Sequence, residues 1–356
     1  MRPACGPGGH LLRNALRLIV GIAVSLGCLY FATRGTDWGA VAEVLGRARP
    51  GWIAVVVVVS LLSVYVRAQR WRVLLRPLGR VGLYPALSAT AIGFGATAVL
   101  PFRLGELIRP ALLARRARVG MSAALSSVVL ERLFDMLLVI GCFLAVSVIL
   151  PEVPPDKRAA AMKMRHAAFV LAGLGGAGFA LLVVMQRDRR RAEALIARVI
   201  GRLPGWIGRH AHPLVTSFMN GLGGLADLRT VLLVLGYSVV LWAGIIMLTF
   251  LCSFLALDLH PPLLAASLTT VVIVAVAVFV PQAPGFIGTW QYGCVLALEM
   301  FKVPHDAAVG YSILTWIVQM AVNVGTAGFF LAREDLSLGT LLRIAPRETS
   351  TAESGG

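Results

Sequence analysis

Charged residues are scarce in this chain. Of its 356 residues, 58% are hydrophobic and 14% are charged, whereas roughly a quarter of a soluble domain is charged. The apolar residues form runs close to the ~20 residues that a helix needs to cross a bilayer. These runs lie at 14–32, 121–150, 166–185, 231–257 and 306–331, with a shorter run at 51–65. Because backbone groups in lipid must bond within their own segment, the runs predict an all-α integral membrane fold.

Acidic residues are scarcer still. The chain has 33 Lys and Arg against 17 Asp and Glu, a formal net charge of +16. In a soluble protein this surplus would suggest a nucleic-acid partner. Here the basic residues fall in short segments between apolar runs, where positive charge sets membrane topology. We therefore expect no nucleic-acid partner, and a membrane phospholipid or glycolipid instead.

Several signatures of soluble chemistry are missing. The five cysteines are scattered with no CxxC pair, so they are expected to pack as small apolar residues. His210-x-His212 lacks a third ligand, so no metal site is predicted. There is no Walker loop, nucleophile elbow or HExxH motif. These absences exclude a nucleotide-driven pump for this chain alone and predict no cofactor, no catalytic residues and no enzyme activity.

The arginines predict six full crossings and two helical hairpins. The first run follows a basic segment without a cleavage site, which indicates a retained signal anchor. The apolar stretch 84–100, which is broken by Pro101, is predicted to form a hairpin with 103–118 that enters the membrane from the cytoplasm and returns. The stretch 261–301 is predicted to be a second hairpin, entered from outside. This arrangement puts most Lys and Arg in the cytoplasm, including the 186–230 segment. The chain is thus expected in a bacterial inner membrane with both termini cytoplasmic and a tail, 332–356, disordered at its end.

The two broken stretches resemble each other. Pro101–Gly105 and Pro281–Gly285 share a Pro-x-x-x-Gly pattern, which predicts an internal repeat. Each unit would hold three crossings and a hairpin, so the units would face opposite ways, a pattern that points to a transporter's central site. The predicted units are 14–150 and 166–331 within a single domain of residues 1–356. The predicted re-entrant loop residues are Pro101, Gly105, Pro281, Pro284, Gly285 and Gly288.

Three charged residues follow the first break at a spacing of three. Arg103, Glu106 and Arg109 would share one face of a helix, and a helix that begins near Arg103 would add its N-terminal dipole. Arginine binds phosphate with two parallel hydrogen bonds, so this stripe predicts an anion or headgroup site. The alternative is an interfacial helix whose charges face water.

A second charged group lies inside an apolar run. Glu131, Arg132 and Asp135 begin roughly 13 Å into the predicted helix, where charge is costly and marks a polar interior. We expect them to line a water-filled translocation site, so that Asp135→Asn changes stability little. The alternative is a structural ion pair. Arg67, Arg70 and Trp71 are predicted to contact lipid at the membrane interface.

At these motifs the sequence resembles the flippase-like membrane domain of bacterial lysylphosphatidylglycerol synthases and its stand-alone relatives. The shared motifs are Arg67-x-x-Arg70-Trp71, Pro101-x-Arg103-x-Gly105-Glu106-x-x-Arg109, Glu131-Arg132-x-x-Asp135 and Pro284-Gly285-x-x-Gly288. The resemblance implies a membrane protein that flips or handles polar lipids. It also implies that six charged residues bind the lipid headgroup: Arg103, Glu106, Arg109, Glu131, Arg132 and Asp135.

The chain departs from the family's pattern at two positions. Phe286 stands where the family often has a second glycine, and Gln291 stands where it has an acid. The chain also ends soon after Leu331, so no soluble aminoacyl-transfer domain is expected. We predict a flippase for an anionic or glycosylated lipid. The alternatives are an accessory subunit that presents lipid to a glycosyltransferase or aminoacyl transferase, and a membrane enzyme using Glu131 and Asp135 as acid and base.

Overall fold

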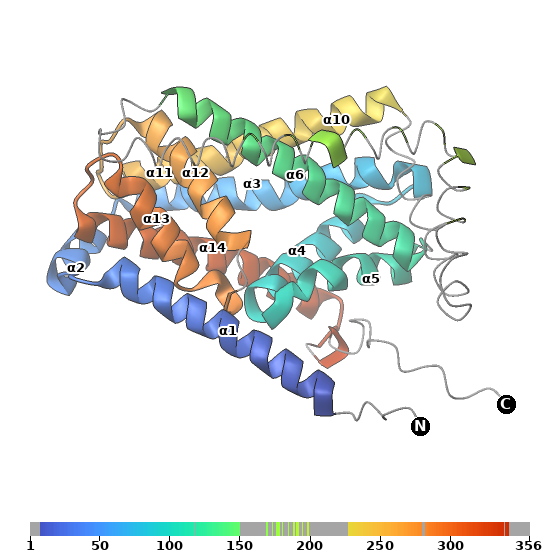
Figure 1. Cartoon of the computed structure of the whole chain (residues 1–356), viewed down its shortest axis with the longest axis horizontal. Helices are drawn as coiled ribbons and strands as arrows, with labels where there is room; N and C mark the ends of the chain where they lie inside the picture. Colours follow the sequence, from blue (N-terminus) through green and yellow to red (C-terminus); the bar gives the residue numbers. More distant parts are fainter. Residues whose placement is uncertain are drawn as a thin grey trace. The chain divides into compact units, whose positions relative to one another are not determined.

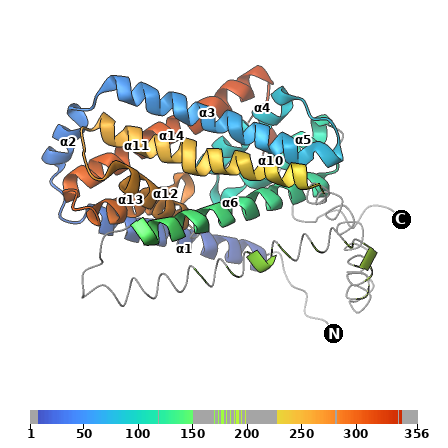
Figure 2. The same ribbon diagram turned by 90° about the horizontal axis from the view of Figure 1, so that it is seen from above.

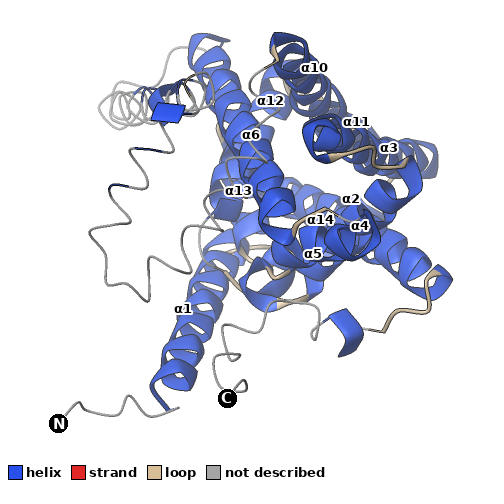
Figure 3. Cartoon of the chain, turned by 90° about the vertical axis from the view of Figure 1, so that its right-hand side faces the viewer, coloured by secondary structure: helices blue, strands red, loops and turns tan. Residues whose placement is uncertain are grey.

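The computed structural model describes residues 8–117, 119–149, 227–279, 282–337 and 339–341, with scattered positions between 169 and 198. Every regular element in these ranges is helical, and no strand occurs among them (Figure 3). The predicted all-α class is therefore confirmed. Some predicted features lie wholly or mostly outside the described residues, namely the crossing at 166–185, the 186–230 segment, Pro281 and the end of the tail.

The described helices follow the apolar runs, with short breaks between them (Figure 1). The helices before the undescribed middle are α1 (Gly8–Thr33), α2 (Trp38–Gly46), α3 (Pro50–Leu75), α4 (Leu83–Val99), α5 (Gly105–Ala117) and α6 (Met121–Ile149). Those after it are α10 (Leu228–Val239), α11 (Met247–Ala256), α12 (Leu263–Phe279), α13 (Thr289–Glu299) and α14 (His305–Arg333). Short turns between them are η1 (Arg76–Leu78), η2 (Pro101–Arg103), the π-helical η4 (Val240–Ile246) and η5 (Pro284–Phe286).

Three described stretches are long and apolar enough to cross a membrane. They are Pro50–Leu78, Leu228–Ala256 and His305–Arg333, each of 29 residues. A fourth would be the pair Ile19–Thr33 and Trp38–Gly46, which is bent by 83°. The long helix α6 also has 29 residues but carries charged residues within it. The chain is accordingly a multi-pass membrane protein.

The order of elements repeats along the chain. A long helix, a 17-residue helix, a 3-10 turn, a short helix and a 29-residue helix occur as α3, α4, η2, α5, α6 and again from α10 to α14. Both turns begin with proline after an extended residue, Leu100 (ψ 145°) or Ala283 (ψ 157°). Both also contain a non-glycine residue of positive φ, Arg103 (53°) or Phe286 (60°). The two breaks therefore share one backbone design.

The helix α10 begins with a side-chain cap. Asp227 accepts hydrogen bonds from the Thr230 hydroxyl (2.7 Å) and from the backbone N–H groups of Arg229 and Thr230 (3.1 Å each). These bonds satisfy donors that the first turn of a helix leaves without partners. They favour the ionised carboxylate and hold the pKa of Asp227 below its usual value.

The chain forms two compact units, each built from separate stretches of sequence. The first unit comprises Met1–Ser60, Gly95–Gly105 and Met247–Gly325. The second unit comprises Leu61–Phe94, Glu106–Ile246 and Thr326–Gly356. Helices such as α3 and α14 begin in one unit and end in the other, so neither unit is a contiguous half of the sequence.

In the first unit, α12 and α13 form a hairpin joined by η5 (Figure 1). Gly293 of α13 lies against α12, where an added Cβ would be 3.3 Å from Val274. The helix α1 packs along α13, and its Ser25 hydroxyl accepts a hydrogen bond from the N–H of Ala283 at 2.8 Å. Gly288 has a φ of 86°, and a Cβ there would overlap the Ser25 carbonyl. Only glycine allows α1 to approach this break.

In the second unit, α4 and α5 form the other hairpin. The guanidinium of Arg109 lies 5.9 Å from the ring of Phe94, and Arg116 donates a hydrogen bond to the hydroxyl of Ser88 at 2.7 Å. Arg109 thus contacts a later residue of α4 than Arg116 does, although it comes earlier in α5. The two helices are therefore antiparallel. In the same unit α10 lies alongside α6 (Figure 2).

Candidate functional site

The helix α6 carries two buried carboxylates. Glu131 is 0% exposed and Asp135 is 2% exposed, and their spacing of four puts them on one face of the helix. A buried carboxylate without a partner costs several kcal/mol. The neighbouring helices of the second unit supply the partners.

Arg70 of α3 is the main partner of Asp135. Its Nη1 and Nη2 lie 2.5 and 3.2 Å from the two Asp135 oxygens, and Nη2 lies 3.0 Å from Glu131 Oε1. Nη1 also donates to the Ser238 hydroxyl of α10 at 2.9 Å. Arg70 is 0% exposed, so this ion pair is shielded from solvent and holds α3, α6 and α10 together.

Arg109 of α5 is the main partner of Glu131. Its Nη1 lies 3.0 and 2.9 Å from the two carboxylate oxygens. The guanidinium stacks over the Trp71 ring, 4.0 Å from its centroid, a favourable cation–π arrangement. Trp71 is held in turn by a 2.9 Å hydrogen bond from its indole N–H to the Ser127 hydroxyl. The position of Arg109 is thus set by side chains of two neighbouring helices, α3 and α6.

Two further groups complete the arrangement around Asp135. Trp242 donates its indole N–H to Oδ1 at 2.8 Å, and it lies in the π-helical turn η4, a distortion that is frequent at functional sites. The Arg132 nitrogens lie 3.6 and 3.7 Å from Glu131 and Asp135. The Arg132 side chain is 30% exposed, so it is the most accessible charged group here. We call Arg70, Arg109, Glu131, Arg132 and Asp135 the charge cluster.

The charge cluster has more positive than negative charge. Three guanidinium groups meet two carboxylates, and the flanking Arg67 and Glu106, which interact electrostatically with Arg132, leave that surplus unchanged. In the described part of the chain, Nε of Arg70, Nε and Nη2 of Arg109 and Nε of Arg132 are buried without a hydrogen-bond partner. Buried donors in proteins nearly always have partners. The surplus and the unfilled donors are suited to an anion.

The structure brings together four of the residues that the sequence predicted. Arg109, Glu131, Arg132 and Asp135 form one cluster, and Glu106 interacts with Arg132. The expected water-lined surroundings of Asp135 are wrong, because its carboxylate is buried and paired with Arg70.

The predicted stripe of Arg103, Glu106 and Arg109 on one helix face is also wrong. The helix α5 begins at Gly105, and Arg103 lies before it in η2 with a φ of 53°, so Arg103 has no helical register with Glu106. Its guanidinium instead donates to the carbonyl of Val278, close to the end of α12 within the first unit. A cation at a helix C-terminus is stabilising, so Arg103 caps this helix.

The predicted interfacial contact also needs correction. Arg70 and Trp71 are 0% exposed because α3 continues as a buried helix to Leu75, well past the apolar run. The remaining member, Arg67, is partly buried, with its guanidinium 4.9 Å from the Phe94 ring. A continuous helix over 50–75 would have marked Arg70 as a charge at depth. No sequence signal marked Ser238 or Trp242.

The predicted loop residues lie at the two breaks. Pro101 begins η2, Gly105 begins α5 and is buried, and Pro284 begins η5. Gly285 and Gly288 have positive φ angles of 76° and 86°. Among the described residues, no three His, Cys, Asp or Glu side chains are grouped to hold a metal ion.

Two comparisons with known proteins bear on this chain. The sequence is similar to the glycosyltransferase AglD of Haloferax volcanii, with 24% identity over 395 residues. The match covers 99% of this chain but 63% of that protein, so the chain spans less than two thirds of this relative. The family model of the lysylphosphatidylglycerol synthase TM region matches residues 18–325. The chain therefore belongs to the family of the lysylphosphatidylglycerol synthase transmembrane region.

Proposed function

We propose that this protein is a lipid transporter that binds an anionic headgroup at the charge cluster and moves the lipid between bilayer leaflets. The observation that carries the proposal is the buried surplus of positive charge, with guanidinium donors that no described residue satisfies. Charges inside membrane proteins are costly and mark substrate pathways. Membership of the family supports a role in handling membrane lipid.

Arg109 offers the binding geometry. Its Nη1 is occupied by Glu131, and its face is covered by Trp71, which leaves the edge formed by Nε and Nη2. The two N–H groups on that edge are parallel, the arrangement that binds two oxygens of a phosphate at once. Glu131 and Trp71 therefore orient Arg109 toward a phosphate rather than neutralise it.

The finer topology belongs to the same proposal. We propose six crossings and two re-entrant hairpins, α4–α5 and α12–α13. This arrangement would give two sequence repeats, 14–150 and 166–331, of opposite orientation in the membrane. The repeated order of elements supports this arrangement, as do the proline turns that interrupt both hairpins. Irregular backbone at membrane depth occurs where it lines a protein-covered site. Both termini would then lie on the cytoplasmic side of a bacterial inner membrane.

An accessory role is the second candidate. The similarity to a Haloferax volcanii glycosyltransferase that is longer than this chain supports a membrane part that presents a lipid to a partner enzyme. An enzyme role for Glu131 and Asp135 has less support, because guanidinium groups and the Trp242 indole already occupy these carboxylates. Such contacts stabilise the ionised form and suit positioning more than proton transfer.

Liposome transport separates these functions. Purified protein reconstituted alone should move fluorescent phosphatidylglycerol between leaflets, and Arg109→Gln should abolish the movement. The matched control is Arg115→Gln on the same helix, where the side chain is exposed. Movement by Arg109→Gln at the normal rate would refute the proposal. Movement only with an added enzyme would favour the accessory role, and a change in lipid mass would favour an enzyme.

A further inference from the structure

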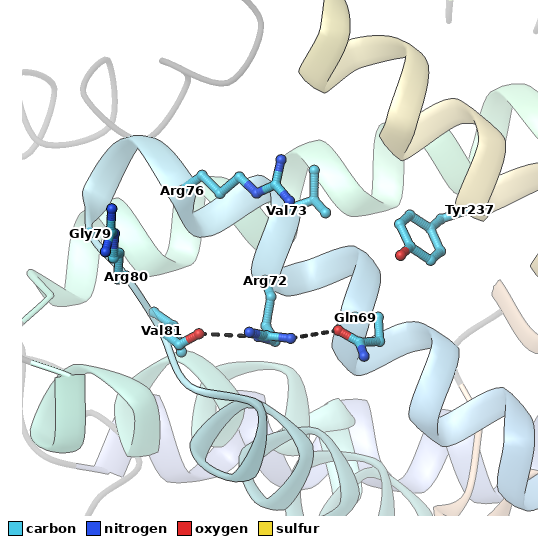
Figure 4. Close-up of a pocket in the computed structure, with 8 residues that line it drawn as sticks. All are labelled: Gln69, Arg72, Val73, Arg76, Gly79, Arg80, Val81 and Tyr237. Carbon is cyan, nitrogen blue, oxygen red and sulfur yellow. Dashed lines mark hydrogen bonds between the residues drawn. The ribbon is translucent and has the colours of Figure 1, made fainter.

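A second basic site lies at the end of α3, within the second unit. A pocket of about 420 Å³ opens between the last turns of α3, the segment that leads to α4, and α10 (Figure 4). It shares no residue with the charge cluster. Its lining residues are Gln69, Arg72, Val73, Arg76, Gly79, Arg80, Val81 and Tyr237.

The lining carries charge of one sign. Three of the eight residues, Arg72, Arg76 and Arg80, are arginines, and none is acidic. Within the described ranges, no carboxylate forms an ion pair with any of the three. Three guanidinium groups around one cavity repel each other, so an anion placed among them is stabilised by all three. The charge of the pocket therefore selects an anionic ligand.

One of these arginines is held in place before any ligand arrives. Arg72 donates from Nε to the carbonyl of Val81 at 3.1 Å and from Nη1 to Oε1 of Gln69 at 2.7 Å (Figure 4). These two bonds fix the guanidinium against the pocket wall. A group that is already ordered loses less entropy on binding. Arg72 thus has the geometry of a binding residue rather than of a freely solvated side chain.

The backbone brings the other two arginines to the same cavity. Pro77 lies inside the turn η1, and Gly79 follows it with a φ of 142°, a conformation that side chains beyond glycine rarely adopt. The chain reverses here, so Arg76, which begins the turn, and Arg80, which follows it, line one cavity. Both side chains are exposed and are free to close on a ligand.

The remaining residues that line the pocket are suited to contact the part of a lipid where the headgroup joins the acyl chains. Val73, Val81 and the Tyr237 ring provide apolar surface, and the Tyr237 hydroxyl provides a polar end. On the same helix, α10, Leu232 and Leu235 are 57% and 38% exposed, as expected for a surface that faces acyl chains. Tyrosine and arginine are both favoured where the hydrocarbon meets the headgroups.

We propose that this pocket is a second anion site, which binds a phosphate group through Arg72, Arg76 and Arg80. The phosphate belongs either to the headgroup of an anionic lipid or to free phosphate. Gln69 and Tyr237 are the chain neighbours of Arg70, a member of the charge cluster, and of Ser238, whose hydroxyl accepts a hydrogen bond from Arg70 at 2.9 Å. The two sites therefore lie on the same α3–α10 contact, but each has its own arginines and can be altered alone.

The test uses the double variant Arg76→Gln/Arg80→Gln. Its matched control is Arg34→Gln/Arg115→Gln, which removes two exposed arginines outside the pocket and changes the net charge equally. Purified proteins in an uncharged detergent are titrated with dioctanoyl phosphatidylglycerol, and the bound lipids are counted by native mass spectrometry. We expect the pocket variant to bind one lipid fewer than wild type, or to bind it about tenfold or more weakly, and the control to match wild type.

A second measurement identifies the source of the phosphate. Millimolar inorganic phosphate should raise the melting temperature of wild type by more than that of the pocket variant if the site takes free phosphate. A lipid deficit with the same phosphate response in both proteins assigns the site to a lipid headgroup. An unchanged lipid count together with an unchanged phosphate response overturns the proposal, as does an equal deficit in the control. Failure of the charge cluster to bind lipid would lower the count in all proteins equally and leave the difference intact.

Discussion

At the scale of single residues, the charge cluster shows how one arginine can serve two purposes. The Nη1 of Arg109 satisfies the buried carboxylate of Glu131, while its Nε and Nη2 remain without partners in the described chain. The planar guanidinium makes this possible, because its donors point along fixed and separate directions. A lysine in the same place would provide the charge without the second pair of parallel donors.

Arg109→Lys tests this separation of stability from binding. The ammonium keeps the charge beside Glu131 but loses the stacking of the guanidinium on Trp71, so the free energy of unfolding should fall by about 1–2 kcal/mol, whereas binding of phosphatidylglycerol should weaken about tenfold or more. Chemical denaturation in detergent gives the stability, and lipid titration gives the affinity. Normal affinity in this variant would mean that the Nε–Nη2 edge does not hold the headgroup.

Asp135→Asn tests the buried pair with Arg70. Both side chains are almost fully buried, and the substitution leaves the Arg70 charge with only part of its compensation from Glu131. Breaking a buried pair in this way costs about 3–5 kcal/mol, so the melting temperature should drop substantially. Arg132→Gln is the control, because that side chain is 30% exposed and its loss should cost less. A normal melting temperature for Asp135→Asn would show that water reaches the pair.

At the scale of elements, the two breaks depend on proline and glycine. Proline begins each 3-10 turn, since its fixed φ and missing N–H suit a helix start. Beyond the second break, Gly288 lets α1 pack directly on the start of α13. A residue with no side chain thus sets how closely two helices approach.

Gly288→Ala should displace α1 from this break. Its φ of 86° is unfavourable for alanine, and the added Cβ overlaps the Ser25 carbonyl. Together these effects should lower the free energy of unfolding by about 2–5 kcal/mol. Gly236→Ala on α10 is the control, because a Cβ there meets nothing within 4 Å and alanine favours helix. Equal melting temperatures for the two variants would contradict the close contact with α1.

For the whole molecule, the distribution of arginines predicts the orientation of the chain in the membrane. The 186–230 segment is rich in arginine and is predicted to lie in the cytoplasm. This prediction depends on the first re-entrant hairpin, because a full crossing in its place would move this segment to the other side, whereas a full crossing in place of the second hairpin would move only the C-terminal part of the chain.

Cysteine labelling tests the orientation. In a variant without the five native cysteines, a cysteine introduced between residues 186 and 226 should react with an impermeant reagent only after the cells are permeabilised. Arg34→Cys, at an exposed position after α1, should react from outside and serves as the control. Labelling of the 186–226 position in intact cells would refute the two-hairpin topology and the inverted repeat with it.

The class of molecule and the places where its helices break could be predicted from local properties of the chain. Hydrophobicity over 20 residues is a local property, and so is the effect of proline and glycine on the backbone. The cost of charge at membrane depth also singled out Glu131, Arg132 and Asp135 without a structure.

Which groups meet in the charge cluster depends on how the helices pack. The partners of Asp135 are Arg70 and Trp242, separated from it by 65 and 107 residues, and no local pattern relates positions so far apart. The backbone at Arg103 turned that side chain away from the helix it was predicted to join. Which guanidinium donors stay unfilled depends on every neighbour at once, so the anion site is a property of packing and not of any single motif.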